Sequence, residues 1–393
     1  MATAVSPQPV GEVRQLQLPT RVPWYLWCAV LGVTSVAIGA YFDVSWRRSM
    51  GRNAFWTPAH MAIYLCGVLA GISFGYLILS STFVRGSATR EGAVRVLGFR
   101  GPLGAFIAAL GAIAMIASAP FDSWWRNAYG LDVKIISPPH ALLALGTLAV
   151  QAGLLFVIAS TMNRAGWESG AYRRLQALLL YVSGLMLIQT MFVRSEFTTD
   201  AALHNARAYV AISLGVPIFY GLVWKGARHR WACTLMAAVY SLFAIGAILI
   251  LPLFPAQPKL GPVYQPIAHF APPQFPLLLI VPAILLDLLR RRIGGEKSLL
   301  IAAVSGPVFL LSLVAAQWPF ADFLMTKAAH NPFFAAGYSD YSAEPWSHDL
   351  LRQFADPQNG FALWSGLGIA VLYSTASIWL GLMLGDWMRK IQR

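Results

Sequence analysis

Charged residues are scarce in this chain: they make up 11% of its 393 residues, against about 25% in an ordinary soluble protein. Hydrophobic residues make up 57%, which excludes a soluble domain of usual composition. The three cysteines, Cys28, Cys66 and Cys233, show no C-x-x-C spacing, and we expect them to be core residues. A phosphate-binding loop, a dinucleotide fingerprint, an EF-hand and an H-E-x-x-H zinc motif are all absent from the sequence. These absences remove the commonest soluble-enzyme classes and leave any catalytic residue unknown.

Long apolar runs are what the sequence has in abundance. Several approach or exceed the roughly 20 residues that a helix needs to cross the hydrocarbon core. Their unbroken Leu, Ala, Ile and Gly content fits helices, which satisfy their own backbone hydrogen bonds in lipid. The sequence therefore predicts an all-α polytopic membrane protein of about ten spans. The expected spans are 24–42, 58–82, 103–121, 138–162, 176–192, 207–224, 232–254, 272–289, 298–317 and 362–388.

Basic residues are unevenly distributed between the loops. Nineteen of the 29 fall in the two tails and in alternate loops, whereas the other loops balance ten basic with ten acidic residues. The positive-inside rule then predicts that both termini are cytoplasmic in a bacterial inner membrane. The first 22 residues are polar, and the long apolar run that follows lacks a small-residue cleavage pattern, so we expect the first span to be an anchor and not a cleaved signal peptide. Because the basic residues form no continuous patch, we expect a lipid bilayer and no nucleic acid as the partner of this charge.

An internal repeat is the strongest signal. Asp43, Trp46, Arg47, Gly51 and His60 recur in the same order in a second copy. The second copy comprises Asp122, Trp125, Arg126, Gly130 and His140. In each copy an apolar run ends at the Asp, and Pro-x-His opens the next run, with proline suited to a first helical turn. The repeat unit is therefore predicted to be a helical hairpin, duplicated in the N-terminal half.

The repeat places ligand-type side chains at helix ends on one side of the membrane. Ionisable groups there are expected to face the bundle interior and to pair with each other, with an ion or with arginine. Asp43, His60, Asp122 and His140 could together bind Cu(II), Zn or Fe. Alternatively, Arg47 and Arg126 lie four residues after the two aspartates and could pair with them structurally.

The first copy resembles the C subunit of the copper membrane monooxygenases, the family of particulate methane and ammonia monooxygenases. The stretch from Asp43 through Trp46 and Arg47 to Thr57-Pro58-Ala59-His60 is similar to that subunit's D-x-x-W-H, F-T-P-x-H segment. The second copy is similar to its other metal-ligand segment, with its Asn, His and His at the positions of Asp122, Arg126 and His140. The resemblance covers roughly residues 35–160.

The resemblance implies a metal site, with copper as the ion, and partner subunits in the membrane or periplasm. Asp43 and His60 match family ligands, whereas arginine stands at both middle histidine positions, 47 and 126. Arginine stays protonated and offers no lone pair to a metal. Either the two half-sites combine into one Asp₂His₂ site, or the protein keeps the scaffold without the metal.

Asp200 and His204 are possible additional ligands. Together with Glu196 they are spaced four residues apart, which would place them on one helix face. The same residues also fit a helix N-cap followed by a solvent-facing histidine. Both interpretations, additional metal ligands or a helix N-cap with an exposed histidine, stay open at the level of the sequence.

The chain is accordingly divided into five segments. They are a cytoplasmic tail (1–23), a duplicated-hairpin unit (24–162), further transmembrane helices (163–317), an extracytoplasmic segment (318–361), and a last helix with a basic tail (362–393). Three functions remain open: a metal-binding subunit of a complex resembling a copper monooxygenase, a non-catalytic scaffold or docking subunit without metal, and a transporter. For the third, the sequence indicates duplicated hairpins but no broken helix.

Overall fold

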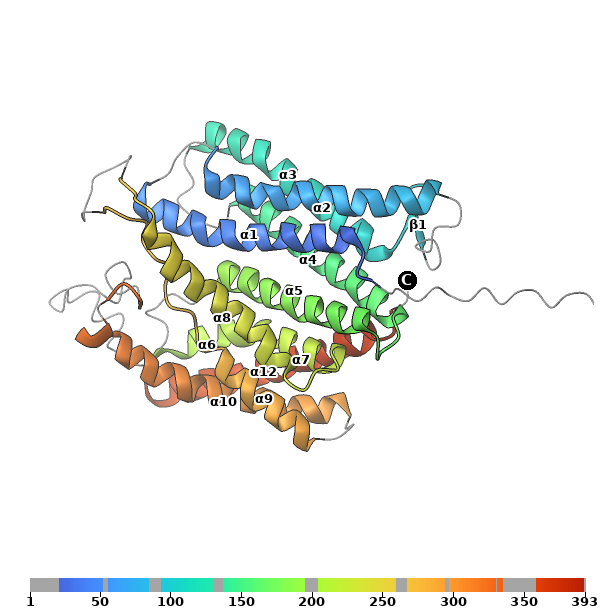
Figure 1. The fold of residues 1–393 in the computed structure, drawn as a ribbon. Helices are drawn as coiled ribbons and strands as arrows, with labels where there is room; N and C mark the ends of the chain where they lie inside the picture. The colour runs from blue at the N-terminus through green and yellow to red at the C-terminus, as the bar shows by residue number, and fades with distance from the viewer. Residues whose placement is uncertain are drawn as a thin grey trace, which may run out of the picture.

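The computed structural model is an all-helical bundle with one short β-hairpin (Figure 1). It describes residues 21–51, 56–84, 93–130, 137–194, 204–258, 267–293, 297–329, 331–334 and 358–391. Its long helices are α1 (Trp24–Ser49), α2 (Pro58–Phe83), α3 (Leu103–Tyr129), α4 (Pro138–Arg164), α5 (Gly170–Arg194), α8 (Ala232–Ile250), α10 (Ser298–Leu324) and α12 (Gly360–Met388). The shorter elements are β1 (Val94–Val96), β2 (Phe99–Gly101), α6 (Ala206–Ser213), α7 (Val216–Gly226), η3 (Leu251–Leu253), α9 (Ile280–Arg292) and η4 (Lys327–Ala329).

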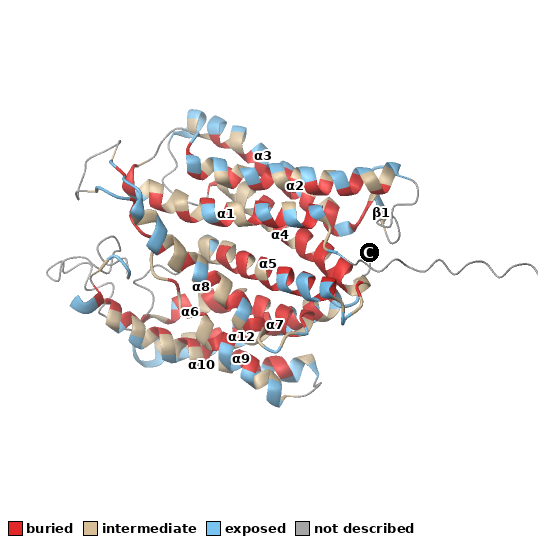
Figure 2. Ribbon diagram, viewed as in Figure 1, coloured by how far each residue is buried: buried red, intermediate tan, exposed pale blue. Residues whose placement is uncertain are grey.

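The expectation of a polytopic all-α membrane protein is confirmed. Among the described residues, nine helical stretches are long and apolar enough to cross a membrane, with α6 and α7 together counting as one. Large apolar side chains such as Leu31, Ile72 and Ile113 are exposed. Exposed residues recur along the helices of the bundle (Figure 2). In water such a surface would be a liability, whereas in a bilayer it faces lipid tails.

The expected eighth span, 272–289, does not form one continuous membrane-spanning helix. Only its second half is helical, as the 13-residue α9, and the preceding residues run as irregular chain. Side chains from other helices satisfy this backbone: the Leu277 and Leu278 N–H groups donate to Tyr240 and Gln317, and the Leu279 carbonyl accepts from Tyr220. Irregular backbone at membrane depth is tolerated where protein buries it in this way.

The span expected over 207–224 is also interrupted. Helix α6 ends at Ser213 and α7 begins at Val216, with Gly215 at φ +113° between them. A positive φ favours glycine, and Pro217 at the second position of α7 has no N–H to continue the α6 ladder. The expectation that no helix is broken is therefore wrong, and the Gly-Val-Pro sequence was the signal for the break.

Glycines bring two pairs of helices, α3 with α4 and α7 with α12, into backbone contact. Gly104 and Gly111 of α3 face Gly153 and Gly146 of α4, where an added Cβ would lie 2.6 Å from a facing carbonyl oxygen. In the C-terminal half, a Cβ on Gly381 of α12 would overlap the α7 backbone. Small residues allow this approach, and close packing then replaces the hydrophobic drive that lipid does not supply.

The hairpins of the repeat, α1–α2 and α3–α4, pack side by side. Trp24 and Met388 lie at one end of the bundle, and the ends of α1 and α3 with the starts of α2 and α4 lie at the other (Figure 1). All residues of the repeat are thus at the end opposite to the two described chain termini.

Candidate functional site

The sequence had suggested that the two aspartates of the repeat lie at helix ends. In the structure they lie inside helices. Helix α1 continues six residues past Asp43, and α3 continues seven past Asp122. The glycines of the repeat follow the helices: Gly51 and Gly130 have φ values of +82° and +87°. Only glycine adopts this conformation without steric cost, which explains why each copy has a glycine eight residues after its aspartate.

The histidines sit in the first turn of α2 and α4, as expected. Pro58 and Pro138 begin the two helices, and Thr57 and Ser137 precede them as N-cap residues. The Thr57 hydroxyl accepts a hydrogen bond from the His60 N–H at 3.1 Å. The Thr/Ser-Pro-x-His pattern therefore fixes the direction in which each histidine enters the site. The capping role of Thr57 was missed from the sequence, although it precedes a proline; Ser137 at the same position of α4 makes no capping hydrogen bond and contacts the His140 ring instead.

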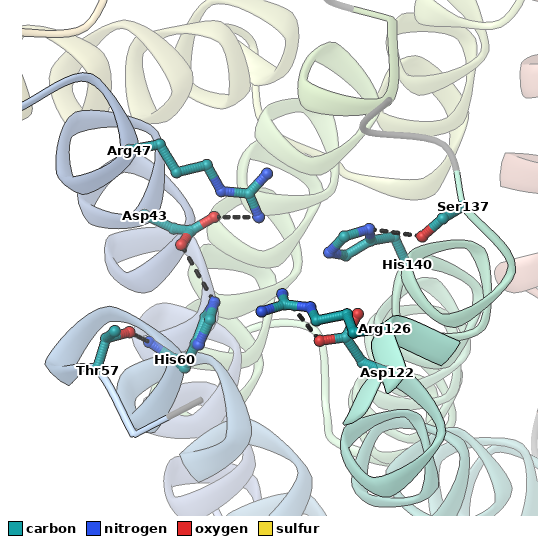
Figure 3. A network of polar contacts seen from close by, with 8 residues as sticks. All are labelled: Asp43, Arg47, Thr57, His60, Asp122, Arg126, Ser137 and His140. Atoms are coloured by element: carbon teal, nitrogen blue, oxygen red, sulfur yellow. Dashed lines mark hydrogen bonds and ion pairs between the residues drawn. The ribbon is translucent and has the colours of Figure 1, made fainter. Parts of the chain in front are cut away.

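The expected Asp–Arg pairs are formed in both copies. Arg47 Nη2 lies 2.8 Å from Asp43 Oδ2, and Arg126 Nη2 lies 2.9 Å from Asp122 Oδ2 (Figure 3). All four side chains are largely shielded, with exposed fractions between 11% and 29%. In this setting an ion pair is screened less than on a water-exposed surface.

The histidines of the two copies have different contacts. His60 Nε2 lies 3.3 Å from Asp43 Oδ1, so both oxygens of Asp43 have a partner. His140 Nδ1 instead lies 2.8 Å from the Ser137 hydroxyl. Within the described part of the chain, the second oxygen of Asp122 is buried without a hydrogen-bond partner. The duplicated sequence therefore gives two chemically unequal halves.

A small cavity lies between the hairpins. Its volume of about 20 Å³ suffices for roughly one water molecule. The lining residues are Asp43, Trp46, Arg47, Gly51, Thr57, His60, Arg126 and His140. Arg126 reaches across from α3 so that its guanidinium group lies between His60 and Asp122 (Figure 3). The structure thus brings Asp43, His60 and His140 around one space, with two arginines in its wall.

The donor set does not fit a bound metal ion in this arrangement. Among the described residues, no group of three or more His, Cys, Asp or Glu side chains is close enough to hold one. Both carboxylates are engaged by guanidinium groups, whose positive charge opposes a cation at the cavity. The metal prediction itself stays a prediction that metal analysis must decide.

Of the two possible additional ligands, only His204 can be placed, and it does not join this site. Asp200 lies outside the described residues, and His204 is associated with α10 instead. His204 Nε2 is 2.9 Å from Asp322 Oδ1, although the ring N–H is not aligned for a hydrogen bond. The His204 ring also lies edge-on to Trp318, with centroids 5.0 Å apart. Neither Asp322 nor Trp318 was singled out from the sequence, because their approach to His204 depends on helices that are far apart in the chain.

Arg194 was also missed from the sequence. It ends α5, and its Nη1 donates to the Ala211 carbonyl at the C-terminal end of α6. The break between α6 and α7 is further held by Ser377, whose hydroxyl accepts from Gly215 N–H and donates to the Ser213 carbonyl. The polar groups freed by the broken helix are thus taken up by α5 and α12.

Comparison of the chain with models of protein families, with curated proteins and with solved structures gives no match.

Proposed function

We propose that this protein is an integral membrane subunit of a larger assembly, built on a duplicated hairpin like that of the copper monooxygenase C subunit. In it, each aspartate of the repeat is neutralised by an arginine of its own helix, at a place where the resembled family uses a metal. The subunit is a scaffold, and any catalytic centre belongs to another chain.

One observation carries this proposal: the guanidinium groups contact the aspartates from the two positions where the resembled family has ligand histidines. Arg47 and Arg126 bind Asp43 and Asp122 at 2.8 and 2.9 Å. Each arginine therefore fills the coordination position with a fixed positive charge. A cation that bound both carboxylates would lie close to both guanidinium charges, which repel it.

The orientation in the membrane follows from charge. Basic residues gather at the end of the bundle that carries Trp24 and Met388, in the loops after α2, α4, α7 and α9. By the positive-inside rule this end is cytoplasmic, which places the Asp–Arg–His site at the extracytoplasmic face of a bacterial inner membrane. Partner subunits that contact the site are then membrane or periplasmic proteins.

The test combines metal analysis with native mass spectrometry on protein extracted in a mild detergent. We expect the wild type to carry no stoichiometric copper, zinc or iron, and to be released together with other chains. We also expect the double variant Arg47→His with Arg126→His to gain metal, because it restores a His at i+4 from each aspartate.

The matched control is Arg47→Gln with Arg126→Gln, which removes the charges without adding a metal ligand. If this control also takes up metal, the arginines only repel the ion. Near-stoichiometric metal in the wild type that is lost in His60→Ala with His140→Ala would overturn the scaffold proposal and establish the metal-binding alternative, with copper first to be sought. A lone monomeric chain would count against a larger assembly.

A transporter is the second candidate, and the interrupted helix α6–α7 favours it. Discontinuous helices place backbone polar groups at membrane depth, where many transporters bind their substrates. In this chain the helix that follows the break also contacts the end of the irregular segment before α9, since Tyr220 of α7 donates to the Leu279 carbonyl. Asp287 on α9 is not free to serve transport, because it accepts hydrogen bonds from the N-terminal N–H groups of α8 at Cys233 and Thr234.

Transport predicts that water reaches the break in some state of the protein. Ser213 is fully buried, so Ser213→Cys should react with a membrane-impermeant thiol reagent only if such a state opens. The control is Ser305→Cys, equally buried in the unbroken helix α10, with the wild type giving the background of the native cysteines. Equal, negligible labelling of both variants from either side would remove the transporter candidate.

A further inference from the structure

A second and larger cavity lies at the opposite end of the bundle from the Asp–Arg–His site. Its volume of about 360 Å³ is in the range of small-molecule and lipid sites. Apolar side chains form most of the wall: Val94, Leu103, Phe156, Trp387 and Ile391. The remaining lining residues are Gly104 and Lys390.

Four separate elements hold the walls of this groove in place. Helices α3 and α4 are in backbone contact at Gly104, where a Cβ would lie 2.6 Å from the Gly153 carbonyl oxygen. Asn163 of α4 donates to the carbonyls of Met388 and Ile391, both at 2.7 Å, and so fixes the chain after α12. The β-hairpin is bound to α2 through Thr82, which accepts from the Arg100 N–H at 2.8 Å. The groove is therefore formed in advance of any ligand.

The groove combines an apolar wall with one cation at the level where the helices leave the membrane. The Phe156 and Trp387 rings pack edge to face with centroids 5.1 Å apart, and Trp387 is 44% exposed, as is common for tryptophan at a membrane interface. Lys390 follows the end of α12 and is exposed. The ion pairs formed among the described residues do not include Lys390. The cation is thus available to an external negative group.

We propose that this groove binds an anionic phospholipid, with an acyl chain along the Leu103, Phe156 and Trp387 wall and the headgroup phosphate at Lys390. A soluble anion would gain nothing from the apolar wall, and an uncharged apolar molecule would gain nothing from Lys390. Basic pockets between helices at a membrane surface are suited to anionic headgroups. The site is independent of the proposed scaffold function, since it shares no residue with the Asp–Arg–His site.

The test measures lipid retention by native mass spectrometry of the purified full-length chain. Phosphatidylglycerol and phosphatidylcholine are titrated separately into detergent-solubilised protein. We expect phosphatidylglycerol to bind with a stoichiometry near one and phosphatidylcholine to bind more weakly. Lys390→Gln should weaken phosphatidylglycerol binding about fivefold, which is the effect of one lysine near an anionic surface. Lys327→Gln, an exposed lysine at the other end of the bundle, should have no effect.

A second variant separates the wall from the charge. Leu103→Trp fills the groove from a position that is already 42% exposed, so it should leave folding intact and abolish lipid retention. Equal binding of both lipids, or no effect of either variant, would overturn the proposal. Displacement of the bound lipid by inorganic phosphate alone would also overturn it, because the groove would then be a soluble-anion site.

Discussion

Replacing Asp122 with alanine is expected to lower the free energy of unfolding by about 3 kcal/mol or more, the usual effect of removing one partner of a buried ion pair. Asp122 is 8% exposed and pairs with Arg126 at 2.9 Å. Without the carboxylate, the Arg126 guanidinium would stay in the bundle with no counter-charge, and its Nε already lacks a hydrogen-bond partner among the described residues. Thermal unfolding in detergent, followed by circular dichroism, measures the loss.

The double variant Asp122→Ala with Arg126→Leu should recover most of this stability, because it removes the orphaned charge together with its partner. Asp386→Ala is the control: its carboxylate lies 3.9 Å from Lys225 and is 37% exposed, so about 1 kcal/mol or less is expected. If Asp122→Ala were neutral and its double variant no better, the Asp122–Arg126 pair would not stabilise the bundle. The scaffold proposal would then lose its main support.

The second large effect is expected at the crossing of α7 and α12. Gly381→Val should abolish the folded protein, because its Cβ would overlap the Ile218 carbonyl, which is backbone and cannot move aside. Overpacking of a core costs about 1 to 3 kcal/mol where side chains can adjust, and here no side chain is available to do so. Size-exclusion chromatography after heating gives the fraction of protein that remains monodisperse.

Gly71→Val in α2 is the matched control. The sequence shows Gly67, Gly71 and Gly75 at a spacing of four, which is typical of a helix-packing face. In the structure, a Cβ added to Gly67 would lie 3.2 Å from the Ile116 side chain. A Cβ added to Gly71 or Gly75 would meet no atom within 4 Å. Gly71→Val should therefore leave the protein monodisperse. Equal loss in both variants would show that valine, and not the crossing, is responsible.

Much of the architecture could be predicted because lipid restricts what a backbone can do. A membrane-spanning segment must satisfy its own hydrogen bonds, so long apolar runs can be read directly as helices. The starts of α2 and α4 at Pro58 and Pro138 were also predicted from local sequence, because proline is suited to the first turn of a helix. The predictions failed where distant side chains replace local bonds, as at the α6–α7 break and before α9.

The candidate site shows the same division. The repeat and the Asp43–Arg47 and Asp122–Arg126 pairs follow from spacing along one helix, and the structure forms both pairs. The partner of His204 could not be predicted, since Asp322 approaches it from α10. Whether the site residues bind a metal stays a prediction for metal analysis.

The sequence by itself determined the membrane class and the duplicated hairpin, because these depend on hydrophobicity and on helix periodicity. It offered the pairing of each aspartate with the arginine four residues on as an alternative to a metal site. Only the tertiary structure decided that His60 reaches Asp43 while His140 contacts Ser137, and that Arg126 lies in the wall of a water-sized cavity. The physical reason is that helix packing sets these contacts through side chains on different helices. No local pattern in one helix specifies the distance to the next.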